Sequence, residues 1–359
     1  MSRSRRNLII FVFAIFATCL ITQDFYLMTD SRIFSDSPFW ENPEFKKEIF
    51  QHKLFKEILN GQLPESVISQ LPVLWWHPEE RFKASDPLPV FLSSRLIYRE
   101  LIPYFPFLTK TRIDYGQINA IDWRSVNEAG AGPTSIVTRL HETGGIKKGY
   151  AGFELHYDPT LQNNQNAPLL WRLSKHPVFA DLQPESPTEA LVPIEFWYHM
   201  TYNYTSIHFG FHDGDWESFL FLFKVEKKDN ELHFSPWMVS VSAHGHTTWR
   251  CFHNLTKHDN RPELFSALGT HATFIDEGIQ PRLYPDRTAR GENWKTWLNT
   301  RYLPKEPYYG FSGSWGRTSY VDFQNGPIPP GPDFKYLPRE TEKAAAKKSF
   351  ARVASGCSN

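Results

Sequence analysis

Apolar and aromatic residues are densest between residues 191 and 275, where their pattern predicts β-strands. Residues 194–201 are rich in aromatic and other β-favouring side chains, and residues 216–226 form a nearly unbroken apolar run. A polar stretch at 227–231 separates this run from a second β-favouring segment at 232–243. Two such segments joined by a short polar turn predict a β-hairpin.

The run at 216–226 is apolar on both of its faces, because side chains alternate along a strand. One face carries Phe219, Phe221, Phe223 and Val225, and the other carries Trp216, Leu220 and Leu222. A strand covered on both sides lies within a sandwich or beneath helices. We therefore expect a mainly β fold, with a β-sandwich-like core, peripheral helices and long loops. The 27 prolines and 20 glycines favour such loops over a helical bundle.

Two flanking segments show other patterns. Residues 43–70 carry apolar side chains at helical spacing, interrupted by Gly61 and Pro64, and we expect this amphipathic helix to pack on the domain. Residues 111–190 are polar and weakly periodic, which predicts loops around a core. We divide the chain into a linker with the amphipathic helix at 24–70, a β domain at 71–335 and a polar helical tail at 336–359.

The N-terminus has the features of a secretory signal. Arg3, Arg5 and Arg6 precede an uncharged apolar run at residues 8–21. These 14 residues are fewer than the roughly 20 that span a bilayer. Residues 1–23 are therefore either a cleaved signal peptide or a signal-anchor that holds the chain in the membrane. In both cases the remainder is lumenal or extracellular, either secreted or attached by a single pass.

Charge and cysteine content narrow the function classes. The formal net charge is zero, so nothing indicates a nucleic-acid partner. Of three cysteines, one lies in the N-terminal apolar run, which leaves Cys251 and Cys357 for at most one bridge within the domain. Asn203 and Asn254 begin the two glycosylation sequons, and both are acceptors in a lumenal glycoprotein.

The strongest candidate for chemistry is the run His212-Asp213-Gly214-Asp215-Trp216-Glu217. Gly214 favours a tight turn just before the strand. Asp215 and Glu217 then point to the same side, where two carboxylates repel each other unless a cation lies between them or one is protonated. His212 can fold back from the turn to add a nitrogen. The three side chains suit Mg²⁺, Ca²⁺, Mn²⁺ or Zn²⁺, and the sequence does not choose among these ions.

Two further histidines are candidates to complete the metal shell. His244 ends the second strand of the hairpin, and His271 follows Gly269-Thr270. Either could instead act as general base if the ion activates water. The plain alternative is that all these residues are satisfied hydrogen-bonding groups at a sheet rim. The chain contains no nucleophile elbow, zincin motif, P-loop or dinucleotide fingerprint.

The run at 212–217, with Ser242-Ala243-His244-Gly245 and Gly269-Thr270-His271-Ala272, resembles the vacuolar protein sorting-associated protein 62 family. Two outer segments add to the resemblance: Leu71-Pro72-Val73 with Glu79-Glu80-Arg81-Phe82 and Ser85-Asp86, and Gly313-Ser314-Trp315-Gly316 with Gly326-Pro327 and Gly331-Pro332. Together they cover residues 71–335. The same core is distantly similar to the necrosis- and ethylene-inducing peptide family, which implies a β-sandwich with a divalent cation held by His212, Asp215 and Glu217. That family's second histidine is Gly214 here.

These patterns together lead to a functional expectation. We expect a lumenal or extracellular binding module in which a divalent cation organises a pocket for a glycan or lipid headgroup. The resemblance implies a part in delivering proteins to the vacuole or in vesicular traffic. A metal-assisted hydrolase is the alternative, and a purely structural cation is a third reading.

Overall fold

The computed structural model describes residues 48–49, 51–102, 105–118, 152–158, 167–174, 189–204, 212–229, 231–243, 246–280, 285–309, 311, 315–316 and 348–357. The fold is mainly β, as the sequence predicted. The signal segment at 1–23 lies outside the described residues. No helix within the described ranges is long and apolar enough to cross a membrane.

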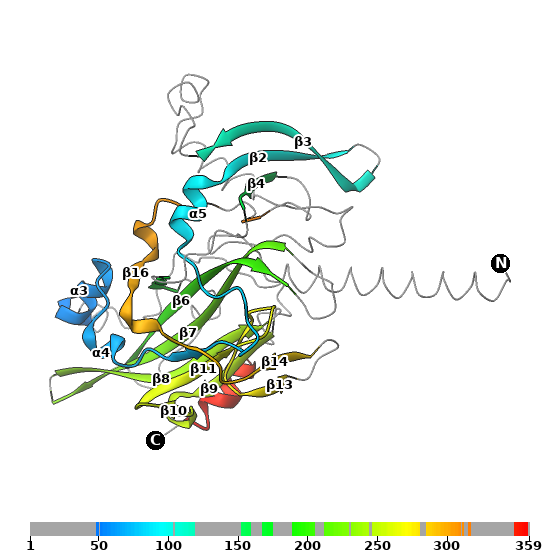
Figure 1. Ribbon diagram of the computed structural model, residues 1–359. Helices are drawn as coiled ribbons and strands as arrows, with labels where there is room; N and C mark the ends of the chain where they lie inside the picture. The colour runs from blue at the N-terminus through cyan, green and yellow to red at the C-terminus, as the bar shows by residue number, and fades with distance from the viewer. Residues whose placement is uncertain are drawn as a thin grey trace.

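A six-stranded sheet forms the centre of the molecule (Figure 1). Its order is β16-β5-β6-β7-β8-β9, and every neighbouring pair is antiparallel except β16 with β5. The bounds are β5 Leu169–Leu173, β6 Glu189–Asn203, β7 His212–Lys228, β8 Glu231–Ala243, β9 His246–Cys251 and β16 Thr300–Tyr302. The predicted hairpin is confirmed as β7 and β8, which pair from Lys228 with Glu231 inward.

Three smaller sheets surround this centre. One contains β1 (Val73–Trp75), β10 (Lys257–His258), β11 (Arg261–Ser266), β12 (Thr273–Phe274) and β15 (Asn293–Lys295). Another contains β2 (Arg95–Ile102), β3 (Phe105–Gln117) and β4 (Gly152–His156), and the last pairs β13 (Gly278–Gln280) with β14 (Asp286–Thr288). The expectation of loops throughout 111–190 was wrong for the end of β3, for β4 and for β5, because neighbouring strands supply the hydrogen bonds that their weak periodicity did not reveal.

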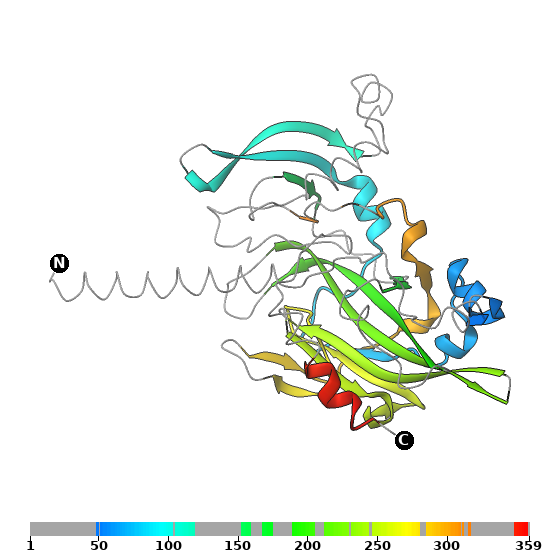
Figure 2. The same ribbon diagram turned by 180° about the vertical axis from the view of Figure 1, so that it is seen from behind.

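Both faces of the central sheet are covered, which explains why β7 is apolar on both sides. On one face, Phe219, Phe221 and Phe223 pack in one core with Leu74 of β1 and Leu264 of β11, so sheet lies on sheet. On the other face, Trp216 and Trp197 pack with Val90 of α5 and with Leu96 of β2. In Figures 1 and 2 the β2–β3 ribbon lies far from the C-terminal helical turn.

Short helices pack around the sheets. They are α3 (Lys53–Leu59), α4 (Glu65–Ile68), α5 (Pro87–Ser93) and the 3₁₀ turns η4 (Phe252–Asn254), η5 (Thr296–Leu298) and η6 (Leu303–Lys305). The amphipathic segment becomes α3 and α4, split near the predicted interruption, where Gly61 has a φ of 76° and Pro64 caps α4. Phe55, Ile58 and Val67 enter the main core, so this helix packs on the domain.

The C-terminal helical turn at 348–354 is fastened to the sheet. Phe350 packs edge-on against Trp249, and Cys357 forms a disulfide with Cys251 of β9. The single bridge available from the sequence is therefore made, and it closes a separation of 106 residues. A disulfide of this kind indicates an oxidising compartment, as in secreted or lumenal proteins.

Candidate functional site

The turn expected before the strand at Gly214 lies inside β7, which already starts at His212, and no other residue could replace this glycine without strain. Gly214 has a φ of 73°, and a Cβ added there would lie 1.9 Å from the carbonyl oxygen of Trp315. Beyond Gly214 the β6–β7 register places Asp215 opposite Met200 and Glu217 opposite Tyr198. The two carboxylates therefore belong to one side of the strand pair, as their spacing predicted.

A loop from the start of the domain reaches this side of the sheet. The backbone N–H of Ser85 donates to the carbonyl of His199 (2.8 Å), which ties the loop to β6. Within the loop, Glu80 accepts hydrogen bonds from the backbone N–H of Phe82 and from that of Gly269, both at 2.7 Å. These two bonds fix the carboxylate of Glu80 over the beginning of β7.

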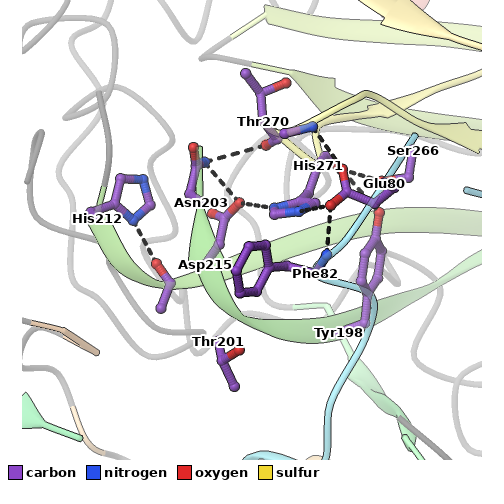
Figure 3. A network of polar contacts seen from close by, with 12 residues as sticks. Glu80, Phe82, Tyr198, Thr201, Asn203, His212, Asp215, Ser266, Thr270 and His271 are labelled. Atoms are coloured by element: carbon purple, nitrogen blue, oxygen red, sulfur yellow. Dashed lines mark hydrogen bonds and ion pairs between the residues drawn. The ribbon is translucent and has the colours of Figure 1, made fainter. Parts of the chain in front are cut away.

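Glu80, His271 and Asp215 form a buried charged cluster, which we call the charged triad (Figure 3). The Nδ1 of His271 lies 3.1 Å from Oδ2 of Asp215, and its Nε2 lies 3.4 Å from Oε1 of Glu80. The side chains of Glu80 and His271 are fully buried, and that of Asp215 is 11% exposed. One imidazole thus bridges two carboxylates that lie 135 positions apart in the sequence.

The backbone of His271 is held in a conformation that favours glycine. Its φ is 56°, in the left-handed region. Its carbonyl oxygen accepts hydrogen bonds from the hydroxyls of Ser266 (3.1 Å) and Tyr198 (3.3 Å). Such strain persists only where surrounding contacts fix it, and it is concentrated at functional sites. Here it turns the imidazole inward, between the two carboxylates.

Asn203 connects the charged triad to the next loop. Its amide nitrogen donates to Oδ2 of Asp215 (3.0 Å) and to the carbonyl oxygen of Thr270 (3.4 Å). The hydroxyl of Thr270 in turn donates to Oδ1 of Asp286 at 2.7 Å. Within the described part of the chain, Oδ1 of Asn203 is buried without a hydrogen-bond partner, and Nε2 of His271 has only its 3.4 Å ion pair with Glu80. An unused hydrogen-bond acceptor therefore lies on the side chain next to Asp215.

The carboxylates determine the charge of the triad. Burial lowers the pKa of His271, but the charge of Glu80 and the hydrogen bond to Asp215 outweigh it and raise the pKa to about 9. Burial raises the pKa of Glu80, yet the adjacent imidazole lowers it overall. Burial also raises the pKa of Asp215, but the hydrogen bond with His271 lowers it, and the net effect is a lowered pKa. Two carboxylates and one imidazolium leave an excess of one negative charge in a buried place.

The residues expected from the sequence are only partly brought together. Asp215 and His271 meet, and His212 lies near enough to Asp215 for their charges to act on each other, although its Nδ1 lies 2.6 Å from the carbonyl oxygen of Gly214 in the same strand. Glu217 lies near enough to Tyr198 for its charge to raise the pKa of that phenol. His244 is outside the described residues. Among the described residues, no three or more His, Cys, Asp or Glu side chains already have the arrangement of a metal site, so the cation remains a prediction.

Sequence reasoning missed Glu80 and Asn203 as members of the site. Glu80 belongs to the Glu79-Glu80-Arg81-Phe82 segment noted only for its resemblance to a family motif, and it lies 135 positions before Asp215. No local spacing rule joins residues so far apart. Asn203 was noted only as a glycosylation acceptor, yet the structure buries its amide and engages the nitrogen that a glycan would need. Asn254 is exposed on η4, and glycosylation at either residue stays a prediction.

Comparison with protein-family models, with curated proteins and with solved structures gives no match to this chain. The resemblance described above rests on the quoted motifs and stays a prediction.

Proposed function

We propose that this chain is a lumenal or extracellular binding domain whose charged triad takes up a divalent cation. The observation that carries the proposal is the convergence of Glu80, Asp215 and His271 in a buried place with an excess negative charge. Carboxylate oxygen and imidazole nitrogen are the donors that Mn²⁺ and Zn²⁺ accept, and a carboxylate-rich set also suits Ca²⁺ or Mg²⁺.

The position of His271 supports this proposal. A buried pair of carboxylates needs a positive partner, and in the absence of metal the imidazolium supplies it. A divalent ion would provide positive charge next to the same carboxylates, and the imidazole would lose its proton to become a ligand. The unpaired amide oxygen of Asn203 is a further donor next to Asp215.

The first experiment measures bound metal and its effect on stability. The domain, produced in a secretory host, is analysed for Mg, Ca, Mn and Zn, and its melting temperature is recorded with EDTA and with each ion. We expect one ion to bind stoichiometrically and to raise the melting temperature. Absence of bound metal, together with the same melting temperature under all conditions, would rule the proposal out.

A second experiment decides which residues bind the ion. Glu80→Gln and Asp215→Asn keep side-chain size while removing charge, and we expect each to abolish the stabilisation by metal. Glu263→Gln is the matched control, because Glu263 is equally buried but is paired with Arg290 and Trp75. His212→Asn and Glu217→Gln test the first expectation from the sequence. If they abolish metal binding and Glu80→Gln does not, the ion belongs to the run at 212–217.

The cation would organise a surface for a larger ligand, for which we propose a glycan or lipid headgroup in vesicular or vacuolar traffic. Binding of the metal-loaded domain to glycan arrays and to liposomes, with and without EDTA, tests this role. A purely structural cation would leave binding unchanged once the fold is retained. No observation favours a hydrolase, since the imidazole of His271 is fully buried and already engaged on both nitrogens.

A further inference from the structure

A second polar cluster lies directly behind the charged triad, on the opposite face of β6 and β7. His199 and Trp216 are paired across the two strands, and their ring centroids are 5.0 Å apart. Trp315 packs on both, at 5.4 Å from His199 and 4.9 Å from Trp216. We call these three side chains the ring cage. Thr201 follows on the same side of β6, and it takes no part in the network of Figure 3.

The polar atoms of the ring cage have no hydrogen-bond partner among the described residues. These atoms are the two ring nitrogens of His199 and the indole nitrogens of Trp216 and Trp315. The hydroxyl of the neighbouring Thr201 also lacks a partner. None of these four residues is more than 6% exposed. Buried polar groups in native proteins are nearly always paired, so five unpaired atoms in one cluster indicate that another molecule pairs with them.

The chemistry of the cage restricts what that molecule can be. Burial lowers the pKa of His199 to about 3, so the ring is neutral, with one nitrogen that donates and one that accepts. The two indoles can only donate. A carboxylate only accepts and would meet no cation here, and an ammonium group only donates. A hydroxyl oxygen does both.

We propose that the ring cage holds hydroxyl oxygen atoms, supplied by ordered water or by the alcohol groups of a small ligand. Aromatic rings with unpaired, buried N–H groups suit either source, because they combine apolar area with hydrogen-bonding capacity. The proposal shares no residue with the cation site and does not depend on it.

Backbone contacts hold the cage closed on the side of β7. A Cβ on Gly316 would lie 1.8 Å from the carbonyl oxygen of Asp213, and one on Gly214 would lie 1.9 Å from that of Trp315. The two chain segments therefore touch through glycines at both points. This close approach fixes the indole of Trp315 over His199 and Trp216.

A high-resolution crystal structure of the wild-type domain is the direct test. We expect oxygen density within hydrogen-bond distance, about 3 Å, of the indole nitrogens of Trp216 and Trp315. In Trp315→Phe the oxygen next to residue 315 should disappear. In the control Trp75→Phe, which removes a known N–H bond to Glu263, the oxygens of the cage should remain. A cage without oxygen density in the wild-type protein overturns the proposal.

Indole N–H resonances provide a second readout that does not need crystals. We expect magnetisation transfer from water, or from an added alcohol, to the N–H of Trp216 and Trp315, with assignments from the Trp→Phe variants. Titration with glycerol and with glucose separates the sources: a shift of these resonances identifies an alcohol group, and transfer from water without a shift identifies ordered water. The absence of transfer from either overturns the proposal.

Discussion

His271 and His199 are both enclosed by protein, on opposite faces of the same two strands, and their imidazoles differ in charge. Burial lowers the pKa of both rings. For His271 the carboxylates of Glu80 and Asp215 reverse that effect and raise the pKa to about 9. For His199 the charge of Asp215 acts too weakly to reverse the effect of burial, and the pKa falls to about 3. Partners within contact distance, not depth of burial, thus determine whether a buried imidazole carries charge.

This difference separates the chemistry of the two faces. The charged triad holds two carboxylates and one imidazolium, and its excess negative charge favours a cation. The ring cage holds only neutral dipoles and calls for a neutral oxygen. β7 carries both sites because neighbouring residues, Asp215 and Trp216, point to opposite sides of one strand.

The largest expected effect comes from breaking the charged triad at Asp215. Asp215→Ala leaves a buried imidazolium with one carboxylate and removes the acceptor for Asn203. Because Glu80 still pairs with His271, the cost comes from the lost charge-assisted contact and from the unpaired amide of Asn203, together about 3–5 kcal/mol of unfolding free energy. Urea unfolding monitored by tryptophan fluorescence measures it. A loss below about 1 kcal/mol would show that the triad contributes little to stability.

Gly214, which lies between the two sites, should give the next largest effect. Gly214→Ala combines a left-handed φ with a clash against the Trp315 carbonyl, and we expect a loss of about 3 kcal/mol or more. Gly116→Ala is the matched control. Its φ is 81° but nothing lies within 4 Å of an added Cβ, so only the backbone cost of about 1 kcal/mol remains. If urea unfolding gave the same loss of unfolding free energy for both variants, the Trp315 segment would have to move away from the added Cβ at little cost.

A pH series tests the charge of the ring cage. The pKa of His199 is about 3 in the folded protein, below the usual 6.5. Below pH 6.5 the unfolded chain therefore binds a proton at His199 that the folded protein does not. The contribution of the neutral ring to folding stability is fully present above pH 6.5 and is lost as the pH falls toward 3. His199→Phe cannot take up a proton, so the variant does not lose this stability at low pH. The stability of the variant relative to wild type should therefore rise by about 1.4 kcal/mol per pH unit below pH 6.5. A constant difference from pH 8 to pH 4.5 would contradict a neutral His199.

The smallest effect is expected at Asn203, which supports the triad from its edge. Asn203→Gln displaces the amide from Asp215 and Thr270, and we expect a loss of about 1–2 kcal/mol in urea unfolding. In a glycosylating host, its electrophoretic mobility should equal that of wild type. Asn254→Gln should instead remove a glycan with little change in stability. The reverse pattern would mean that Asn203 is exposed during or after folding.

Local patterns predicted the strands that carry the site. The unbroken apolar run of β7 and the polar turn after it defined the central hairpin, because both depend on alternation and turn chemistry over a few residues. The same local rules placed Asp215 and Glu217 on one side and Trp216 on the other. They failed for β5, whose position in the sheet depends on pairing with β6 and β16.

The sequence by itself determined the class of fold, the hairpin and the face on which the carboxylate of Asp215 lies. Only the tertiary structure decided that Glu80 and His271 are its partners and that Trp315 covers the opposite face. The reason is physical: alternation and turns act between neighbours in the chain, whereas the charge of a buried group depends on atoms that folding brings from distant segments.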